Sequence, residues 1–415
     1  MQKRKILYFM PDSPVRNDAG NKTHTLQMLE YFETRHEQIQ LDFVGEKYWG
    51  GWEEADAVSF KENFPHCNLY ILGRKLPKKN KIKYVLGYKL PNYIKKHRWL
   101  YRKPALPNNN THILQKSFNR LLKKNKYDYI IISYVTWATL IEKNHYLRGA
   151  KLINDTHDFI TAQLKHTKSF RMGESFEREI QLLSLFDETW SQSADEQYLF
   201  SQFIPKSVHR FVPIMYASHH KHRRPNEQYK YDLIFVGSQN HNNIKSLNWF
   251  FDEVYPLLPK SLRICVIGKI CDYIPNFVNV EKIKFAPDLD EFYYQAQVAL
   301  CPMLSGTGVK VKTIEAFSYG LPVVCNLRGL DGLPLKDNNG CLRGDTPKEF
   351  ANHIISLLNN DDYYKQIREQ AINMFSKYFE KGDCYKNLDQ IFDLRITSDL
   401  PDKEYKKKKY KVVQR

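Results

Sequence analysis

Short apolar runs of strand length alternate with longer helical stretches through most of this chain. In the first half these runs cover 5–10, 41–45, 68–73, 127–134 and 150–158. After a stretch without apolar periodicity, the pattern begins again at 231–238 and 262–269. Alternation of this kind is typical of parallel sheets with helices on both faces. The sequence therefore predicts an α/β protein with two doubly wound, Rossmann-like domains, and 415 residues are enough for two cores.

The predicted domain limits follow from where this pattern stops and restarts. They are 1–218 for an N-terminal domain, 219–229 for a linker, 230–375 for a C-terminal domain, 376–395 for a closing helix and 396–415 for a basic tail. The linker begins with a histidine-rich run at 219–222. Since neither carboxylate nor cysteine accompanies it, this run is interpreted as linker charge rather than as a metal site.

Polar residues at strand ends are candidates for binding, because ligands bind beyond the carboxyl ends of strands in open parallel sheets. In the first half those residues are Gly20-Asn21, Ser133-Tyr134 and Asp155-Thr156-His157-Asp158. Asp155, His157 and Asp158 have the chemistry of a divalent-metal site, and a structural hydrogen-bonding role for His157 is a second alternative. We favour a ligand-binding role for His157 without a metal.

The strongest candidate for ligand binding lies within 296–324. A buried strand over 298–303 leads into the loop Ser305-Gly306-Thr307-Gly308. A helix is expected to begin near Val309 and to end at Gly320 as a left-handed C-cap. Glycines let the backbone approach a ligand closely, and the unpaired N–H groups of a helix start suit a phosphate.

The residue types in the first turns of this helix favour a diphosphate. Lys310 and Lys312 oppose the helix dipole unless an anion neutralises them. Glu315 is expected on the face of Lys312, where it can accept hydrogen bonds from a ribose. The alternative is a glycine loop beside an ordinary exposed Lys–Glu pair. A dinucleotide site is not expected, because Val311 occupies the place of the third glycine of that motif.

Several motifs, taken in order, resemble the GT-B glycosyltransferases, specifically the large retaining family 4. They lie at 6–24, 152–158, 235–238, 266–269 and 283–324. The resemblance implies two domains facing a cleft, with the acceptor bound by the first and a nucleotide sugar by the second. It also implies transfer with retention of configuration from a UDP- or GDP-sugar to a hydroxyl of a glycan or glycolipid. Neither a metal nor a further cofactor is expected if lysines carry the charge of the diphosphate.

The resemblance also assigns roles to individual residues. Backbone N–H groups of Gly308 and Val309 would bind the diphosphate, Lys310 would neutralise it and Glu315 would hold the ribose. His157 would lie near the acceptor or the transferred sugar. The implied donor-binding set is Gly20, Gly237, Ser238, Gly306, Thr307, Gly308, Val309 and Lys312. Independently of the resemblance, the predicted acceptor or membrane set combines the strand-end residues Asp155 and Asp158 with Lys95, Lys96, Arg98 and Trp99 of the basic segment.

Two positions depart from the pattern of the family. Thr307 stands where the family often has a glutamate, and Ser238 stands where it often has an arginine. Lys310 and Lys312, and less directly Lys245, are expected to replace the missing cation. A departing diphosphate needs its charge stabilised, so lysines that replace the missing arginine are chemically reasonable.

The net charge of +17 is concentrated in one part of the chain. Between Asn63 and Lys126 there are 17 Lys or Arg residues and no Asp or Glu. Anionic lipid, acidic glycan and nucleic acid are the candidate partners, and a solvated basic face is the alternative. Nucleic acid is not expected, because the chain lacks an RRM, KH or helix-turn-helix signature. Tyrosines and a tryptophan among the lysines of 74–103 favour a bilayer that carries the acceptor.

The expected location is the cytoplasm, peripheral to the inner face of the plasma membrane. No apolar run approaches the ~20 residues that span a bilayer, and the N-terminal apolar stretch is short for a signal peptide. The expected role is synthesis of a bacterial surface polysaccharide such as capsule or lipopolysaccharide. The alternatives are a related epimerase or hydrolase of sugar nucleotides, and a glycan- or nucleotide-binding protein without turnover.

Overall fold

The computed structural model describes residues 3–15, 20–75, 81–97, 105–168, 170–222 and 229–395. The chain divides into two compact units, which are treated separately below. The first contains 1–192, 196–212 and 389–415, and the second contains 193–195 and 213–388. The main division at Val212 and Pro213 lies a few residues before the domain limit of 218 that the sequence predicts.

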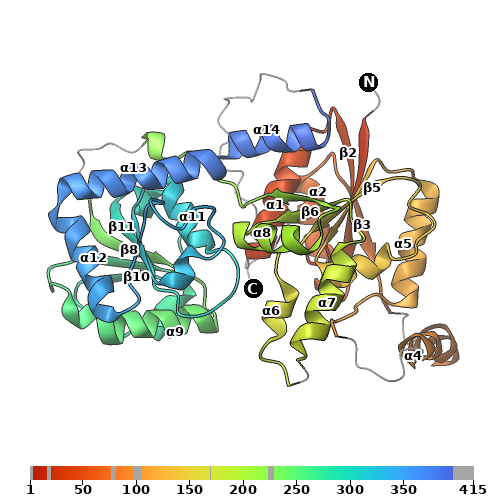
Figure 1. The fold of residues 1–415 in the computed structure, drawn as a ribbon, viewed down its shortest axis with the longest axis horizontal. Coiled ribbons are helices and arrows are strands. Elements are labelled where there is room, and N and C mark those ends of the chain that lie inside the picture. The colour runs from red at the N-terminus through yellow and green to blue at the C-terminus, as the bar shows by residue number, and fades with distance from the viewer. Residues whose placement is uncertain are drawn as a thin grey trace. The chain divides into compact units, whose positions relative to one another are not determined.

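The first unit is built on a parallel sheet with strand order β3-β2-β1-β4-β5-β6-β7 (Figure 1). Its strands are β1 Arg4–Phe9, β2 Ile39–Glu46, β3 Asn68–Leu72, β4 Tyr129–Ser133, β5 Lys151–Asp155, β6 Glu188–Ser191 and β7 Val208–Phe211. Strand β1 pairs with both β2 and β4, so the strand order reverses there. A reversal of this kind leaves a crevice at the carboxyl ends of the strands, where ligands bind.

Helices join these strands in the first unit. They are α1 Gly20–Thr34, α2 Glu54–Asn63, α3 Lys81–Tyr84, α4 Leu90–His97, α5 His112–Lys124, α6 Ile160–Leu164, α7 Met172–Leu183 and α8 Ala194–Phe203. A π-helical turn, Val85–Lys89, joins α3 to α4. One side of the sheet is buried by a core that includes Phe9, Ile130, Phe118 and Trp137. The Gly20-Asn21 pair opens α1, whereas the sequence predicts a loop there.

The second unit repeats the same architecture with strand order β10-β9-β8-β11-β12-β13. Its strands are β8 Tyr231–Val236, β9 Ile264–Ile267, β10 Val280–Ile283, β11 Ala296–Cys301, β12 Val323–Cys325 and β13 Cys341–Arg343. Its helices are α9 His241–Trp249, α10 Asp290–Tyr294, α11 Val311–Ser318, α12 Pro347–Asn359, α13 Asp361–Tyr378 and α14 Lys381–Ile391. They cover both faces of the sheet (Figure 1). The predicted α/β class with two doubly wound domains is thus confirmed.

Two segments near the expected domain limits differ from their predicted form. The closing helix predicted at 376–395 is broken, because α13 ends at Tyr378 and α14 begins at Lys381. Between them the backbone pairs with Tyr216, which donates to Phe379 O (3.0 Å) and accepts from Lys381 N (2.9 Å). The first residue of the predicted linker, His219, stacks on Tyr319 with ring centroids 4.5 Å apart. Within the second unit, pairing therefore holds the break between α13 and α14, and stacking holds His219.

All seven cysteines are free thiols, and all but Cys341 are buried. None of the helices that the structure describes combines the length and the apolarity needed to cross a membrane.

Candidate functional site

The loop between β11 and α11 is held against the first turns of α9. Ser305 Oγ donates to Asn242 Oδ1 (2.7 Å), and the Leu304 N–H donates to Ser246 Oγ (3.2 Å). Gly306 has φ of 96°, and a Cβ there would lie 3.2 Å from Asn242 Nδ2. Both the left-handed backbone and the close approach require glycine at this position. These contacts hold the glycine loop against α9.

Helix α11 begins at Val311, two positions later than the start expected near Val309. Lys310 is its N-cap residue, and its side chain makes no capping bond. The helix ends at Ser318, and Gly320 follows with φ of 67°, which confirms the predicted left-handed residue beyond the C-terminus. Thr307 is exposed, and Gly308 and Val309 are half-buried in the loop ahead of the helix.

Lys310 is buried, with 7% of the residue exposed. Its Nζ donates to Gly308 O (2.6 Å) and lies 3.6 Å from Asp331 Oδ2. Asp331 Oδ2 is also 3.6 Å from Arg328 Nη1. Burial lowers the pKa of Lys310, while Asp331 opposes that shift. The structure thus adds an aspartate and an arginine to this site, neither of which the sequence interpretation included.

Lys312 lies two residues further along and faces β8 and α9. Its Nζ donates to Asn243 Oδ1 (2.9 Å) and lies 4.3 Å from the centre of the Phe235 ring. Burial, together with the neighbouring charge of Lys310, lowers the pKa of Lys312 to about 8. A bound anion would favour the charged form of this lysine.

Asn243 is a residue of this site that the sequence interpretation missed. Its Nδ2 donates to Ser238 O (2.9 Å) while its Oδ1 accepts from Lys312. Its backbone N–H donates to Asn240 Oδ1 (2.8 Å), the N-cap of α9. The run of asparagines at 240, 242 and 243, just after a strand end, was the available signal. This one buried side chain links the loop after β8 to α11.

The predicted residues Gly237 and Ser238 directly follow β8, so they belong to this same corner of the sheet. Ser238 Oγ accepts from Asn240 Nδ2 (3.1 Å). Lys245, in α9, is exposed. The structure therefore brings Gly237, Ser238, the glycine loop and Lys312 together around the N-terminal turn of α9.

Glu315 occupies the second turn of α11 and faces α10. Its Oε2 accepts from Tyr293 Oη (3.2 Å). Tyr293 is buried and stacks on Tyr319 with ring centroids 4.7 Å apart. Lys312 and Glu315 are both half-buried and have different partners, so they are not an ordinary exposed Lys–Glu pair. Tyr293 is a second residue that the sequence interpretation missed.

In the first unit, the candidate residues at the strand ends meet in one cluster. His157 Nε2 lies 3.0 Å from Asp155 Oδ2 and 3.2 Å from Ser133 Oγ. Its Nδ1 lies 2.9 Å from Gln192 Nε2. An amide NH₂ can only donate, so Nδ1 is the acceptor and Nε2 carries the hydrogen that Asp155 accepts.

Tyr134 completes this cluster. Its ring stacks on His157 at 4.7 Å, and both residues have a left-handed backbone, with φ of 59° and 58°. Asn21 Nδ2 donates to Tyr134 Oη (2.7 Å) and to Asp12 Oδ2 (3.2 Å). Residues with side chains rarely adopt this conformation, and such strain concentrates at functional sites. The three polar strand ends predicted for this half are thus brought together.

Behind this cluster lie Tyr8 and His24, which the sequence interpretation missed. Asp155 is 1% exposed; its Oδ2 accepts from Tyr8 Oη (2.8 Å), and its Oδ1 lies 3.4 Å from His24 Nε2. Burial alone would raise the pKa of Asp155, but His157 and His24 hold it well below its usual range. Asp155 is therefore an ionised carboxylate between two imidazoles.

Asp158 and the basic candidates complete the predicted set. Burial raises the pKa of Asp158. Lys95 and Lys96 lie in the last turn of α4, and Arg98 and Trp99 fall outside the described residues. In the part of the chain that the structure describes, no three His, Cys, Asp or Glu side chains are placed to hold a metal ion.

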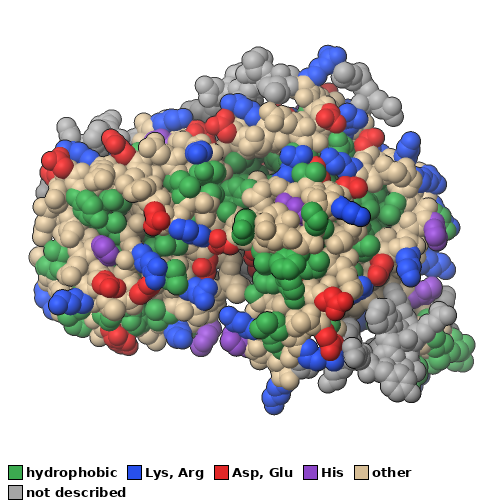
Figure 2. All heavy atoms as spheres, viewed as in Figure 1, with side chains coloured by type: hydrophobic (Ala, Val, Ile, Leu, Met, Phe, Trp, Pro, Cys, Tyr) green, Lys and Arg blue, Asp and Glu red, His purple; other side chains and the backbone are tan. Residues whose placement is uncertain are grey.

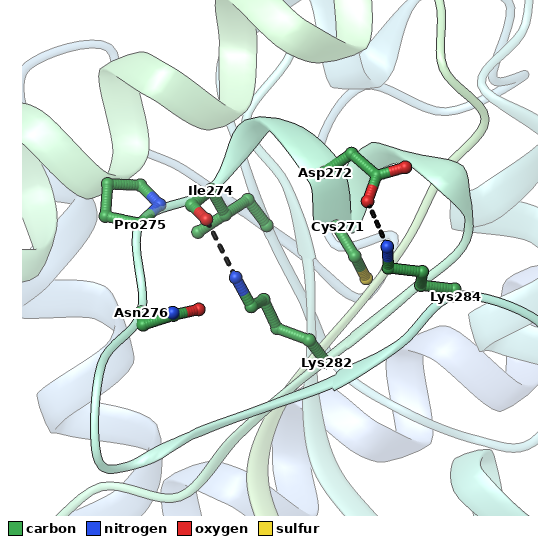
Figure 3. A pocket seen from close by; sticks show the side chains of 7 residues that line it. All are labelled: Cys271, Asp272, Ile274, Pro275, Asn276, Lys282 and Lys284. Atoms are coloured by element: carbon green, nitrogen blue, oxygen red, sulfur yellow. Dashed lines mark hydrogen bonds and ion pairs between the residues drawn. The ribbon is translucent and has the colours of Figure 1, made fainter.

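Figure 3 shows a hollow of about 510 Å³ elsewhere in the second unit, beside β10. Lys282 Nζ points to Ile274 O, to which it donates at 2.8 Å. Lys284 Nζ forms an ion pair with Asp272 (2.5 Å). None of the predicted site residues lines this hollow. The hollow is therefore separate from the residues predicted to bind the donor.

Comparison with known proteins finds a family match that includes the α11 corner. Residues 230–360 match the family of glycosyl transferases group 1, and this range includes the whole of that corner. This segment therefore resembles the group 1 glycosyltransferases. A Klebsiella pneumoniae relative, described as an uncharacterized 44.6 kDa protein in cps region, is 26% identical to this chain over 308 residues. That match covers 67% of this chain and 74% of the relative.

Solved structures share the fold of this chain. HepE from Anabaena, in complex with UDP, has a TM-score of 0.66 at 11% identity and covers 94% of this chain and 99% of its own. Sucrose-phosphate synthase from Thermosynechococcus elongatus has a TM-score of 0.64 at 14% identity and covers 94% of this chain and 98% of its own. These similarities confirm the predicted GT-B fold.

Proposed function

We propose that this glycosyltransferase moves a sugar from a UDP- or GDP-sugar to a hydroxyl of a glycan or glycolipid, with retention of configuration. The observation that carries the proposal is the corner of the second unit where Lys312, Lys310 and Glu315 meet the glycine loop. The complex of the similar HepE with UDP supports a nucleoside diphosphate as the ligand of such a corner. The cps region of the Klebsiella relative supports a role in surface polysaccharide synthesis, with capsule or lipopolysaccharide as the product.

The diphosphate is proposed to bind at the start of α11. Backbone N–H groups of Gly308 and Val309 precede the helix, and Lys312 is a half-buried cation in its first turn. When the sugar leaves, the electron pair of the anomeric C–O bond passes to the diphosphate, whose charge the two lysines stabilise. These cations replace the arginine that Ser238 displaces. We therefore propose that no metal is required.

The ribose is proposed to bind Glu315. A carboxylate accepts hydrogen bonds from both ribose hydroxyls, and Tyr293 holds one of its oxygens in place. Thr307 stands where the family often has a glutamate. We therefore propose that the glycine loop offers the transferred sugar a neutral hydroxyl at this position instead of a carboxylate.

The acceptor is proposed to bind the first unit, at His157 and Tyr134. In a retaining transfer, the acceptor oxygen forms the new bond on the face that the diphosphate leaves, and its proton passes to a diphosphate oxygen. His157 would then position the acceptor or the transferred sugar, and its tautomer is set by Gln192 and Asp155.

The location we propose is the inner face of the plasma membrane, where the protein is peripheral. This location is supported by the excess of Lys and Arg over 63–126, because anionic lipid headgroups attract a positively charged segment.

A nucleotide screen tests the donor part of the proposal. Thermal shift with UDP, GDP, UDP-glucose and GDP-mannose should show stabilisation by one nucleotide and its sugar, because a ligand of the folded state raises the melting temperature. Lys312→Met should lose most of the shift, and the control Lys245→Met should keep it. If no nucleotide stabilises the wild type, the α11 corner is not a donor site. Nucleotide release from the sugar nucleotide without any acceptor would favour a hydrolase or epimerase instead.

A further inference from the structure

The helical segment from Lys81 to His97 exposes a continuous apolar stripe. It consists of α3, the π-helical turn and α4, which follow one another without a break. The stripe residues are between 45% and 71% exposed, and they are Ile82, Val85, Leu86, Leu90, Tyr93 and Ile94. An exposed apolar patch of this kind, on one helical face, marks an interaction surface.

The π-helical turn keeps this stripe on one face. Leu90 N–H donates to Val85 O, five residues earlier, instead of to the residue four before it. Because this turn contains one extra residue, Leu90 lies on the same helical face as Val85. Ile82, before the turn, and Ile94, after it, lie on that face too. A purely α-helical register would place Lys89 on that face. The turn therefore replaces a charge by a leucine in the stripe.

The opposite face of the segment attaches it to the first unit. Tyr84, Tyr88 and Asn92 are half-buried on that side. Asn92 Oδ1 accepts from the backbone N–H of His112, at the start of α5 (3.2 Å), and the rings of Tyr84 and Tyr88 are 5.2 Å apart. Burial raises the pKa of Tyr88. The segment is thus anchored by its polar and aromatic face, with its aliphatic face turned to solvent.

The charge around the stripe indicates what covers it. Lys81 and Lys89 are exposed, and the sequence has 17 basic and no acidic residues from 63 to 126. Figure 2 shows hydrophobic side chains at the lower right edge of that view, where Figure 1 places α4. A helix with aliphatic residues on one face and lysines beside them is typical of a segment that lies in the headgroup region of an anionic bilayer. Nucleic acid would match the lysines and leave the aliphatic stripe uncovered.

We infer that the stripe of Ile82, Val85, Leu86, Leu90, Tyr93 and Ile94 is a docking face that inserts into the headgroup layer of an anionic phospholipid bilayer. The segment lies parallel to the membrane plane, with lysines at the phosphates and aliphatic side chains at the acyl boundary. This inference rests on the membrane location proposed above, and it is independent of the transfer reaction.

Co-sedimentation with vesicles tests this inference on the full chain. The wild type should bind vesicles of mixed phosphatidylglycerol and phosphatidylcholine, and should bind phosphatidylcholine alone much more weakly. The double variant Leu86→Glu/Ile94→Glu should lower binding about tenfold or more, because it removes aliphatic burial and adds repulsion. The matched control is Leu257→Glu/Val278→Glu, which makes the same change at exposed positions of the second unit. It should bind as the wild type does.

Equal binding by both double variants would overturn the inference, because the charge change alone would then set the affinity. Equal binding of both vesicle types would overturn the anionic partner. Sedimentation velocity without lipid tests whether the stripe is instead a dimer interface. If the wild type is a dimer and Leu86→Glu/Ile94→Glu is a monomer, the stripe binds a second copy of the chain and the inference is wrong. The thermal shift with UDP is measured on each variant, so that a failed donor site and a failed docking face give different results.

Discussion

Asn243 and Lys312 are joined by a hydrogen bond of 2.9 Å between Oδ1 and Nζ, and this bond links helices α9 and α11 of the second unit. The other end of the same amide donates to Ser238 O at 2.9 Å. The amide orients both a cation and a backbone segment of the proposed donor site, although it need not touch the donor.

Replacing Asn243 by alanine should weaken nucleotide binding by up to about thirtyfold. The change removes two hydrogen bonds, each of which contributes about 1 kcal/mol. Isothermal titration with UDP measures the effect. Asn243→Asp keeps the acceptor for Lys312 and should recover more affinity than alanine does. Full UDP affinity in Asn243→Ala would show that the amide has no positioning role.

Lys312 should make nucleotide affinity depend on pH. Burial lowers its pKa to about 8, and a bound diphosphate favours the charged lysine. UDP affinity should therefore be level below about pH 8 and fall as pH rises through that value, because binding must then protonate the lysine. Titrations at increasing pH measure the slope. Lys312→Met should bind weakly with no such slope, and an unchanged slope in that variant would assign the titration to another group.

Glu315→Gln should reduce the preference for a ribose over a 2′-deoxyribose. The neutral amide is a weaker acceptor than a carboxylate, since hydrogen bonds to charged groups are about twice as strong. Comparing the affinities for UDP and 2′-deoxy-UDP in the wild type and the variant measures the preference. Glu315→Ala should abolish transfer with the fold intact. The ribose assignment fails if both variants keep the preference of the wild type.

The sequence predicts the parts of this molecule that local pattern controls. Alternating strand and helix patterns predict both sheets, and the glycines at 306 and 320 mark left-handed turns because few other residues adopt them. Lys312 was identified because two lysines at a helix start are electrostatically unfavourable without an anion. Residues such as Asn243 and Tyr293 were missed, because their roles depend on partners far along the chain. His24 was missed for the same reason, since only the fold brings it to Asp155. The end of α13 was also unpredictable, because pairing with Tyr216 sets it.

Asp155→Asn should destabilise the first unit at neutral pH. The folded-state pKa of Asp155 lies below its unfolded value, so its contribution is present above about pH 4 and is lost as pH falls through the folded value. The change replaces a buried carboxylate oxygen that accepts hydrogen bonds from Tyr8 and His157, and a buried donor left unsatisfied costs about 1–3 kcal/mol. Urea unfolding of wild type and variant at neutral and acidic pH measures both parts. The difference between the two proteins should shrink in acid, and a constant difference would contradict an ionised Asp155.

Gly306→Ala should damage the donor site more than it damages the fold. Its φ of 96° is strained for alanine, and the new methyl group would press on Asn242 at 3.2 Å, displacing the loop that leads into α11. Gly149 offers a matched control, because it has φ of 79° and nothing within 4 Å of the added Cβ. Both variants should lose about 1–2 kcal/mol of stability from the left-handed backbone alone. Only Gly306→Ala should also lose UDP affinity, because only that glycine is packed against α9. Thermal unfolding and UDP titration of the two variants separate these effects, and equal loss of affinity in both would refute a specific role for the glycine loop.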